Sequence, residues 1–578
     1  MLTIRESLEA VITEALIKVT GQSDAKAQVI YATRAEFGDY QANGVMSVAR
    51  QLRTNPRELA VKVVAEINGG DLLARAEVAG PGFINLFLST DALAQRASEC
   101  LNDTDRLILP VNKPQTIVVD YSSPNLAKEM HVGHLRGTII GDALVRILEA
   151  LGHCVIRQNH VGDWGTQFGM LIAHLKTLSD DDKALARNLS DLEVFYREAK
   201  QRFDADPGFA ELARSYVVRL QRGDPECLEA WQRFIDESLR HCEDVYALLG
   251  VGLKRSDLCP ESFYNNELAD IVQQLENKEL LTRSEGANCV FLEEFTGKDG
   301  SPLPVIVQKS DGGYLYATTD LAAVRHRCHQ LGADRVLYVV DARQSLHFQQ
   351  VFAVARRAGF ARSDSHLEHI AYGTMMGEDG KPFKTRSGDT VKLRELLDES
   401  IRRAFALVSE KNPDLPEADR QQIADTVGIA AVKYSDLSKN RTSDYIFDWS
   451  SMLSFEGNTA PYLLYAYARI QSVLRRLADE GATPGNRIVL EAAEERALAM
   501  KVLQFAEIVR QLGLDCYPNQ LCLYLYELSG TFMKFYESCP ILKADAELRQ
   551  SRLALAALTA QTLKRGLNLL GIEPLNRM

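Results

Sequence analysis

The chain has 578 residues, of which 46% are hydrophobic and 25% are charged, and its formal net charge is −12. This length is too great for a single hydrophobic core and predicts about three or four domains of a globular protein. The acidic balance argues against a protein that binds nucleic acids nonspecifically, but a local basic patch can still serve a specific RNA partner.

The first 110 residues predict a small α+β domain. Apolar residues recur at helical spacing in residues 4–19, a second helix is expected from about residue 60, and strands end in residues 80–87. Glutamates within the first helix argue against a secretory signal, and no later run is long and apolar enough to cross a membrane. We therefore expect a cytoplasmic protein with no membrane partner.

The polar stretch 112–115 marks a boundary, after which a strand, a loop and a helix follow one another. Residues 116–119 form a β-branched run, and apolar residues repeat at helical spacing after residue 134. His131 and His134 stand at the helix entrance, where Gly133 leaves the backbone bare. Free backbone N–H groups at such an entrance can bind phosphate, although a His-x-x-His pair alone is more often a surface or core feature, or half of a metal site.

Strands and helices then alternate to about residue 358. A strand at 155–158 precedes a charged, mainly helical stretch at 178–250; the alternation resumes with strands at 305–308, 314–316 and 335–340 and helices at 321–331 and 346–358. This order predicts an α/β domain over 111–391 with a doubly wound, Rossmann-like parallel sheet, into which 178–250 is inserted.

Helical periodicity dominates beyond residue 392. We expect a helical connecting region at 392–454 and an all-α domain at 455–578. The ten cysteines are scattered and none forms a Cys-x-x-Cys pair. Their spacing predicts neither a disulfide framework nor a metal site.

Two glycine-rich loops carry residues suited to binding a nucleotide. Residues 159–169 combine three glycines with Trp164 and Phe168, which is typical either of a tight loop around a buried tryptophan or of a ligand site at a strand end. Residues 376–388 carry Lys381, Lys384 and Arg386, which form either a solvated basic loop or a clamp on a triphosphate.

The residues that flank the two histidines make this segment more specific than a His-x-x-His pair alone. His-Val-Gly-His at 131–134, preceded by Pro-Asn-Leu-Ala-Lys at 124–128 and followed by Leu-Arg-Gly-Thr-Ile-Ile-Gly-Asp, resembles the HIGH signature of class I aminoacyl-tRNA synthetases, in the form of arginyl-tRNA synthetases. The resemblance covers nearly the whole chain. It implies a monomer that uses ATP with Mg²⁺ as a substrate, L-arginine and tRNA(Arg), with no tightly bound cofactor.

The resemblance also implies the residues that carry the first reaction step. The sequence at 383–386 departs from the Lys-Met-Ser-Lys-Ser motif of the family, which leaves open which cation replaces its catalytic lysine; the family often pairs this departure with a lysine at the position of Lys128. The implied catalytic residues are His131, His134, Lys128, Lys384 and Arg386, and the implied ATP-binding residues are Gly133, His134, Gly162, Asp163 and Gln167.

A guanidinium substrate needs planar carboxylate partners in a dry pocket. Asp120 ends a predicted strand, and Tyr316 and Asp320 are four residues apart at another sheet edge, although each acid can equally be a helix cap or a turn residue. By resemblance, Asp120, Tyr316 and Asp320 hold the arginine side chain, while the α-amino and carboxyl groups are held by Ser122, Asn125 and Gln344.

Contacts with tRNA are less visible in the sequence. Aromatic and cationic residues follow one another in 456–469, and they can stack on unpaired bases, although such a stretch is more often helix core. The resemblance implies contacts with the anticodon loop and, from the first domain, with the tRNA elbow; the residues are Tyr465, Arg469, Arg475, Tyr536 and Met578 for the former, and Phe83 and Asn85 for the latter.

The implied activity is the formation of arginyl-adenylate and pyrophosphate, followed by transfer of the arginyl group to the 2′-hydroxyl of the terminal adenosine of the tRNA. Three alternatives stay open: a class I synthetase for another amino acid, a nucleotidylyltransferase that uses no RNA, and a noncatalytic RNA-binding protein. Missing zinc-ligand spacing argues against cysteine as the substrate, and the acids at 120 and 320 argue against glutamate. A noncatalytic protein would leave the two histidines unexplained.

Overall fold

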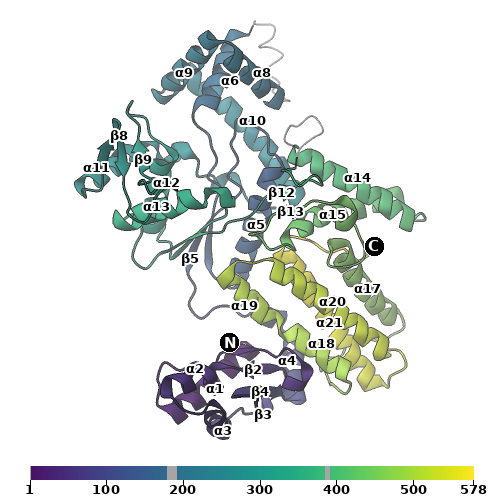
Figure 1. Ribbon diagram of the computed structural model, residues 1–578. Helices are drawn as coiled ribbons and strands as arrows, with labels where there is room; N and C mark the ends of the chain where they lie inside the picture. Colours follow the sequence, from purple (N-terminus) through teal and green to yellow (C-terminus); the bar gives the residue numbers. More distant parts are fainter. Residues whose placement is uncertain (1, 179–191, 384–390) are drawn as a thin grey trace. The chain divides into compact units, whose positions relative to one another are not determined.

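The computed structural model describes residues 2–178, 192–383 and 391–578 (Figure 1). Contacts within the chain separate it into two units. We call Met1–Asn112 with Phe455–Leu569 and Glu573–Met578 the terminal unit, and Lys113–Ser454 with Leu570–Ile572 the central unit.

A four-stranded parallel sheet forms the centre of the central unit. Its strands are β11 (His366–His369), β10 (Arg335–Tyr338), β5 (Thr116–Asp120) and β6 (Cys154–Gln158), in that order. Nearly every residue of β5 and β10 is buried, as in parallel strands covered on both faces. The predicted doubly wound parallel sheet is confirmed.

The expected strands 305–308 and 314–316 do not join this sheet. Strand β9 (Val305–Gln308) pairs antiparallel with β8 (Ala287–Val290), which pairs with β7 (Thr282–Ser284). Along β9, Val305 and Val307 are buried while Ile306 is exposed, the alternation of a strand with one covered face. The strand predicted at 314–316 is wrong, because Tyr316 already begins helix α12 (Tyr316–Arg325).

Helices surround the sheet and fill the region after it. The central unit contains α5 (Leu135–Ala150), α6 (Thr166–Thr177), α8 (Leu192–Ala205), α9 (Pro207–Gln221), α10 (Pro225–Leu249), α11 (Leu268–Asn277), α13 (Ser345–Arg357), α14 (Leu393–Lys411), α15 (Glu417–Leu437) and α16 (Trp449–Met452), with the short pair β12 (Met375–Met376) and β13 (Tyr445–Ile446). Short turns are η3 (Val132–His134), η4 (Arg255–Asp257), η5 (Glu261–Glu267), the π-helical η6 (His326–Gln330) and η7 (Ala342–Gln344). Helices α8, α9 and α10 occupy the inserted stretch.

The terminal unit combines an antiparallel sheet with helices from both ends of the chain. The sheet order is β1 (Val29–Tyr31), β2 (Tyr40–Ala42), β4 (Phe83–Leu88), β3 (Leu73–Ala79). The helices are α1 (Ile4–Thr20), α2 (Gly44–Leu52), α3 (Pro56–Glu66), α4 (Thr90–Asn102), α17 (Ala460–Asp479), α18 (Ala493–Leu503), α19 (Phe505–Asp515), α20 (Asn519–Ser538) and α21 (Ala546–Leu569), with turns η1 (Ala35–Phe37) and η2 (Thr104–Leu107). The predicted α+β and all-α parts are both confirmed.

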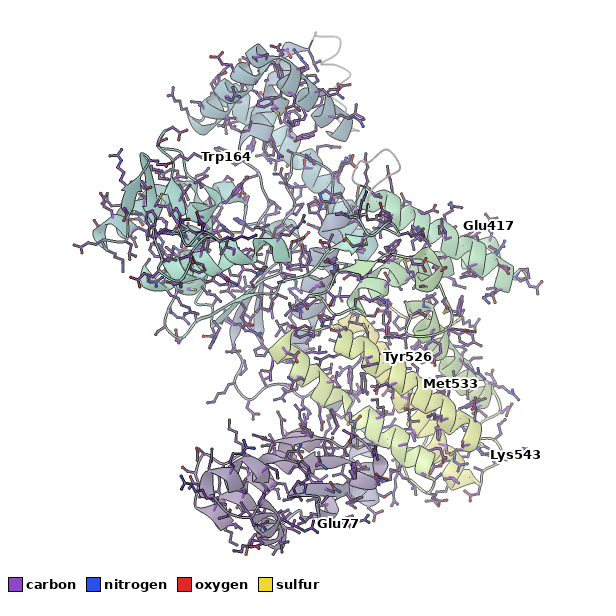
Figure 2. All side chains as sticks on the ribbon, in the orientation of Figure 1. Glu77, Trp164, Glu417, Tyr526, Met533 and Lys543 are labelled. Carbon is purple, nitrogen blue, oxygen red and sulfur yellow. The ribbon has the colours of Figure 1, made fainter. Side chains whose placement is uncertain are left out.

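Aromatic and polar contacts join the parts of the terminal unit. Tyr526 on α20 lies with its ring 5.4 Å from the ring of Tyr462 on α17 (Figure 2). Glu507 on α19 is buried and accepts hydrogen bonds from the hydroxyls of Tyr31 (2.7 Å) and Tyr40 (2.8 Å) in the sheet. Burial raises the pKa of Glu507, so these two donors offset the cost of placing its carboxyl group in the interior. Among the described residues, no helix combines the length and the apolar character needed to cross a membrane.

A buried ion pair anchors helix α5 in the central unit. Nε of Arg136 lies 3.0 Å from a carboxylate oxygen of Asp436 on α15, and both side chains are almost completely buried. Nη1 of Arg136 also donates to the carbonyl oxygen of Ser443 (3.0 Å). The helix that starts at the histidine turn is thereby fixed to α15 and to the segment before β13.

We expect Arg136→Met to lower the free energy of unfolding of the central unit by about 3 kcal/mol, because Asp436 would keep its burial and lose its cation. Thermal or urea unfolding measures the change. The control is Arg402→Met, whose exposed pair with Glu399 predicts a change of at most about 0.5 kcal/mol. If Arg136→Met and Arg402→Met were equally stable, the buried ion pair would not be the anchor of α5.

Candidate active site

The strand order of the parallel sheet reverses between β5 and β10. The chain runs from β5 to β6 on one side, and then returns past β5 to place β10 on its other side. Loops that leave neighbouring strands in opposite directions open a crevice at their carboxyl ends. Asp120 and Tyr338, the last residues of β5 and β10, are paired in register at this edge.

The histidine turn lies directly after the loop that leaves β5. Nδ1 of His131 accepts a hydrogen bond from the backbone N–H of Gly133 (3.1 Å), and Nδ1 of His134 accepts one from the backbone N–H of His131 (3.1 Å). The two imidazole rings have centroids 4.0 Å apart. A Cβ atom at Gly133 would come within 2.8 Å of the His131 ring, so a side chain at this position would displace that imidazole.

Burial keeps both imidazoles neutral. It lowers the pKa of His131, with a further contribution from Lys128, and lowers the pKa of His134 to about 3. Because Nδ1 of each ring accepts a backbone hydrogen bond, this network assigns the single ring proton to Nε2. The turn therefore holds two neutral Nε2–H donors in fixed orientations, which suits the stabilisation of a phosphate whose charge rises during reaction.

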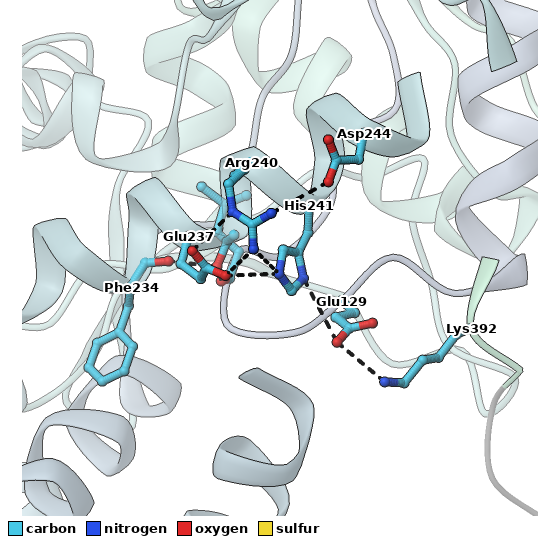
Figure 3. Close-up of polar contacts among 9 residues, drawn as sticks. Glu129, Phe234, Glu237, Arg240, His241, Asp244 and Lys392 are labelled. Atoms are coloured by element: carbon cyan, nitrogen blue, oxygen red, sulfur yellow. Dashed lines mark hydrogen bonds and ion pairs between the residues drawn. The ribbon is translucent and has the colours of Figure 1, made fainter. Parts of the chain in front are cut away.

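The segment before the histidines is held from two sides (Figure 3). Its backbone pairs with the start of α14, through Val132 N to Val391 O (3.0 Å) and Leu393 N to Met130 O (3.0 Å). A carboxylate oxygen of Glu129 lies 3.3 Å from Nζ of Lys392 and 3.8 Å from Nδ1 of His241 on α10. The turn is thus connected to the chain that follows the predicted basic loop.

Of the predicted phosphate-binding cations, Lys128 is described and the other two are not. Lys128 is exposed, and its ammonium group lies 4.6 Å from the ring centroid of Tyr196 on α8. Lys384 and Arg386 lie outside the described residues.

Besides Gly133 and His134 of the histidine turn, the predicted ATP-binding residues are Gly162 and Asp163 on the loop after β6 and Gln167 at the start of α6. Gly162 donates from its N–H to the carbonyl oxygen of Pro124 (3.1 Å) and accepts from the N–H of Leu126 (2.9 Å), which joins this loop to the one after β5. Asp163 is buried and accepts hydrogen bonds from the backbone and hydroxyl of Ser262; burial raises its pKa. Oε1 of Gln167 is buried with no hydrogen-bond partner in the part of the chain that the structure describes. Such an atom is suited to a bound ligand or water.

Asp120 is paired with an arginine of the chain itself. One oxygen of its carboxylate accepts a hydrogen bond from Nη2 of Arg327 (2.8 Å), and the other accepts one from the hydroxyl of Ser123 (3.0 Å). Arg327 is fully buried in the π-helical turn η6, and its Nε donates to Gln158 at the end of β6 (2.6 Å). Asp120 is predicted to hold the substrate side chain, but its carboxylate already has a guanidinium partner in Arg327.

A second group of acids lies at the same edge. Burial, and next the carboxylates of Asp163 and Asp320, raise the pKa of Glu261 to about 7. Partial burial and the Glu261 carboxylate raise the pKa of Tyr316, which is on α12 one turn before Asp320. Glu261 therefore belongs to a cluster of acidic groups with Asp163, Asp320 and Tyr316, and a cation placed among them would be stabilised.

Asp320 has one basic neighbour. Nε2 of His347 on α13 lies 2.6 Å from its carboxylate, and this hydrogen bond raises the pKa of His347. Asp320 lies within the first turns of α12, whose N-cap is Leu315, and so it is not a capping residue.

The three residues predicted to hold the arginine backbone lie in different environments. Ser122 has a left-handed backbone (φ 71°), and its hydroxyl lies 2.7 Å from that of Tyr246. Asn125 accepts a hydrogen bond from the backbone of Ala127 (3.1 Å). Gln344 is exposed at the end of η7, at the carboxyl side of β10.

The predicted tRNA-binding residues all lie in the terminal unit. Tyr465 is 45% exposed on α17, and Arg469, one turn later, lies 5.8 Å from the ring centroid of Tyr536 on α20. Arg475 donates to the carbonyl oxygen of Asn576 (2.9 Å), two residues before Met578. Phe83 begins β4 and is half-buried, whereas Asn85 is buried and accepts a hydrogen bond from Gln41 (2.8 Å).

Sequence reasoning missed Glu261 and Arg327. Glu261 follows Pro260 in a stretch without a motif or a clear period, and Arg327 lies in a helix that looked ordinary. The one available signal for Arg327 was its place in a mainly apolar helix, because arginine is rarely buried unless it has a partner. Among residues 2–178, 192–383 and 391–578, no three His, Cys, Asp or Glu side chains are grouped as metal ligands.

The low pKa of His134 predicts a pH-dependent stability. Between pH 6.5 and about 3 the unfolded chain binds a proton at this residue and the folded chain does not, so acid favours unfolding. We expect wild-type protein to lose up to about 2 kcal/mol more than His134→Gln between pH 7 and pH 5. Urea unfolding at both pH values measures this, with His329→Gln as the control; equal losses in wild type and His134→Gln would contradict it.

Comparison with known proteins identifies the family. Three family models match the chain: "tRNA synthetases class I (R), catalytic domain" over residues 97–449, "DALR anticodon binding domain" over 463–578, and "Arginyl tRNA synthetase N terminal domain" over 6–88. The arginine–tRNA ligase of Hahella chejuensis is 56% identical with 100% of both chains covered, and that of Chromobacterium violaceum is 57% identical with 98% of both chains covered.

Solved structures agree. The crystal structure of arginyl-tRNA synthetase from Plasmodium falciparum has a TM-score of 0.86 at 30% identity, and that of Thermus thermophilus arginyl-tRNA synthetase has 0.83 at 28% identity, each with 100% of both chains covered. The catalytic-domain model alone spans more than half of the chain, and the relatives match it from end to end. The chain therefore belongs to the arginyl-tRNA synthetase family of class I tRNA synthetases.

Proposed function

We propose that this protein ligates L-arginine to tRNA(Arg) in two steps. The carboxylate of arginine attacks the α-phosphorus of ATP, which releases pyrophosphate and forms arginyl-adenylate. The 2′-hydroxyl of the terminal adenosine of the tRNA then attacks the arginyl carbonyl, and AMP leaves. The observation that carries the proposal is a cluster of acidic groups, Glu261 with Asp320 and Tyr316, in a chain whose histidine turn presents two neutral donors at the same sheet.

The histidine turn acts on the phosphates. His131 and His134 donate from Nε2 to oxygens that gain charge as pyrophosphate leaves. Backbone N–H groups at Gly133 and the start of α5 add to this field. Lys128, Lys384 and Arg386 complete the proposed catalytic set by neutralising the departing pyrophosphate.

The adenosine part of ATP lies against the loop after β6. Gly162 allows close approach of the backbone, and Gln167 offers the buried oxygen that has no partner among the described side chains. Asp163 contributes by holding the η5 turn, because its carboxylate is bonded to Ser262. Mg²⁺ enters as part of the nucleotide substrate, since phosphate oxygens are its preferred ligands, and we propose no tightly bound cofactor.

The guanidinium of arginine lies between Glu261 and Asp320, next to the hydroxyl of Tyr316. Ser122, Asn125 and Gln344 hold the α-amino and carboxyl groups. For Asp120 we propose an indirect part: with Arg327 it fixes the turn that carries Ser122. A pocket with buried polar groups rejects substrates that lack the guanidinium, which removes the need for an editing site.

The terminal unit binds the tRNA. Exposed Tyr465, with Arg469 and Tyr536 beside it, suits stacking on unpaired anticodon bases, and Arg475 and Met578 lie near the end of the chain. Phe83 contacts the elbow; buried Asn85 supports the surface through Gln41. We propose that the protein acts as a monomer and that bound tRNA is needed for arginine activation.

We expect arginine-dependent exchange between ATP and pyrophosphate in the presence of tRNA(Arg), and a rate at least about 100-fold lower in His134→Ala, because one preorganised donor to the transition state is lost. Exchange supported equally by another amino acid would overturn the substrate assignment. No exchange with any amino acid, even with tRNA present, would overturn the reaction.

Glu261→Gln should raise KM for arginine more than about tenfold with little change in kcat, because it removes a charge partner of the guanidinium. Since the pKa of Glu261 is raised to about 7, wild-type KM for arginine should fall as pH rises from 6 to 8, and the variant should lose this dependence. Glu276→Gln on the exposed surface of α11 is the control. An unchanged KM in Glu261→Gln would exclude this residue from the pocket.

A further inference from the structure

The last helix of the insertion, α10, contacts the active-site loops with one face. Trp231 donates from its indole nitrogen to the carbonyl oxygen of Asp163 (2.7 Å), and its ring meets that of Trp164 edge to face. Ser238 donates to the carbonyl oxygen of Leu126. His241 lies beside Glu129, as described above. These positions and Tyr246 share one side of the helix at 3.6 residues per turn.

Tyr246 on α10 contacts the loop that follows β5. Its hydroxyl is buried, lies 2.7 Å from the hydroxyl of Ser122, and accepts a hydrogen bond from Nδ2 of Asn159 (3.1 Å). Oγ1 of Thr138 lies 2.8 Å from Oγ of Ser122 and 2.8 Å from the carbonyl oxygen of His134. A continuous chain of polar groups therefore runs from α10 through Ser122 to the histidine turn.

The turn that Tyr246 contacts has a strained backbone. Ser122 and Ser123 both have positive φ angles, 71° and 46°, a region that residues other than glycine rarely occupy. Such a conformation persists only when its surroundings hold it. Asn159 accepts a hydrogen bond from the Ser123 N–H (2.9 Å), Asp120 accepts one from its hydroxyl (3.0 Å), and Tyr246 contacts Ser122.

We propose that Tyr246 is a positioning residue for arginine activation: through Ser122, the insertion helix α10 holds the strained turn in the geometry that binds the amino acid. The inference rests on the proposed function, because Ser122 is there assigned to the substrate. In this proposal the insertion helix α10 helps to shape the active site, although it lies far from the histidine motif in the sequence. Tyr246 itself touches no substrate and acts through the Ser122 hydroxyl.

The test compares Tyr246→Phe with Tyr216→Phe, a matched loss of one hydroxyl on α9 of the same insertion. Arginine-dependent pyrophosphate exchange is measured with tRNA present, together with active-site titration and thermal unfolding. We expect kcat/KM for arginine to fall on the order of tenfold in Tyr246→Phe, mainly through KM, with KM for ATP changed less than about twofold. Tyr216→Phe should match wild type.

A double-mutant cycle separates positioning from general stabilisation. In a Ser122→Ala background, Tyr246→Phe should cause no further loss, because the two hydroxyls act as one unit. Additive losses, an unchanged kcat/KM in Tyr246→Phe, or a loss fully accounted for by a smaller active fraction would each overturn the proposal. A wild-type protein without arginine-dependent exchange would instead overturn the proposed function.

Discussion

The carboxyl edge of the parallel sheet depends on a buried ion pair between Asp120 and Arg327. Burial of two charged groups is costly, and their pairing with each other and further hydrogen bonds offset that cost. Here Arg327 also bonds to Gln158 at the end of β6, and Asp120 also bonds to Ser123 in the turn after β5. One guanidinium thereby ties two neighbouring strand ends and a strained turn together, and the loops that build the site leave from these points.

Desolvation, which makes the buried ion pair costly, also lowers the pKa values of His131 and His134. Exposed imidazoles would be partly protonated near neutral pH, whereas burial lowers the pKa of His134 to about 3. Backbone N–H groups of the turn donate to Nδ1 of each ring, which leaves the ring proton on Nε2. The turn thus presents two hydrogen-bond donors and carries no net charge of its own.

Charge is divided sharply within the central unit. Arg327, a cation of the chain, is paired with Asp120, and Asp320 is bonded to His347, whereas the charged groups nearest Glu261 are the carboxylates of Asp163 and Asp320. One carboxylate at this edge, that of Asp120, is neutralised by an arginine of the chain, and another, that of Glu261, lies closest to other carboxylates. Burial first, and the neighbouring carboxylates second, raise the pKa of Glu261.

Local pattern was enough for the parallel sheet, the histidine turn, the α+β beginning and the helical end, because strand and helix periodicity and a glycine at a helix entrance act over a few residues. The spacing of Tyr316 and Asp320 on one helix was also visible locally. Long-range packing decided the rest. It turned Val305–Gln308 into an antiparallel strand, paired Asp120 with Arg327 from 207 residues away, and placed Glu261 and Tyr246 at the site. No short-range signal marks these residues, because their roles come from burial and from partners that only the folded chain brings near.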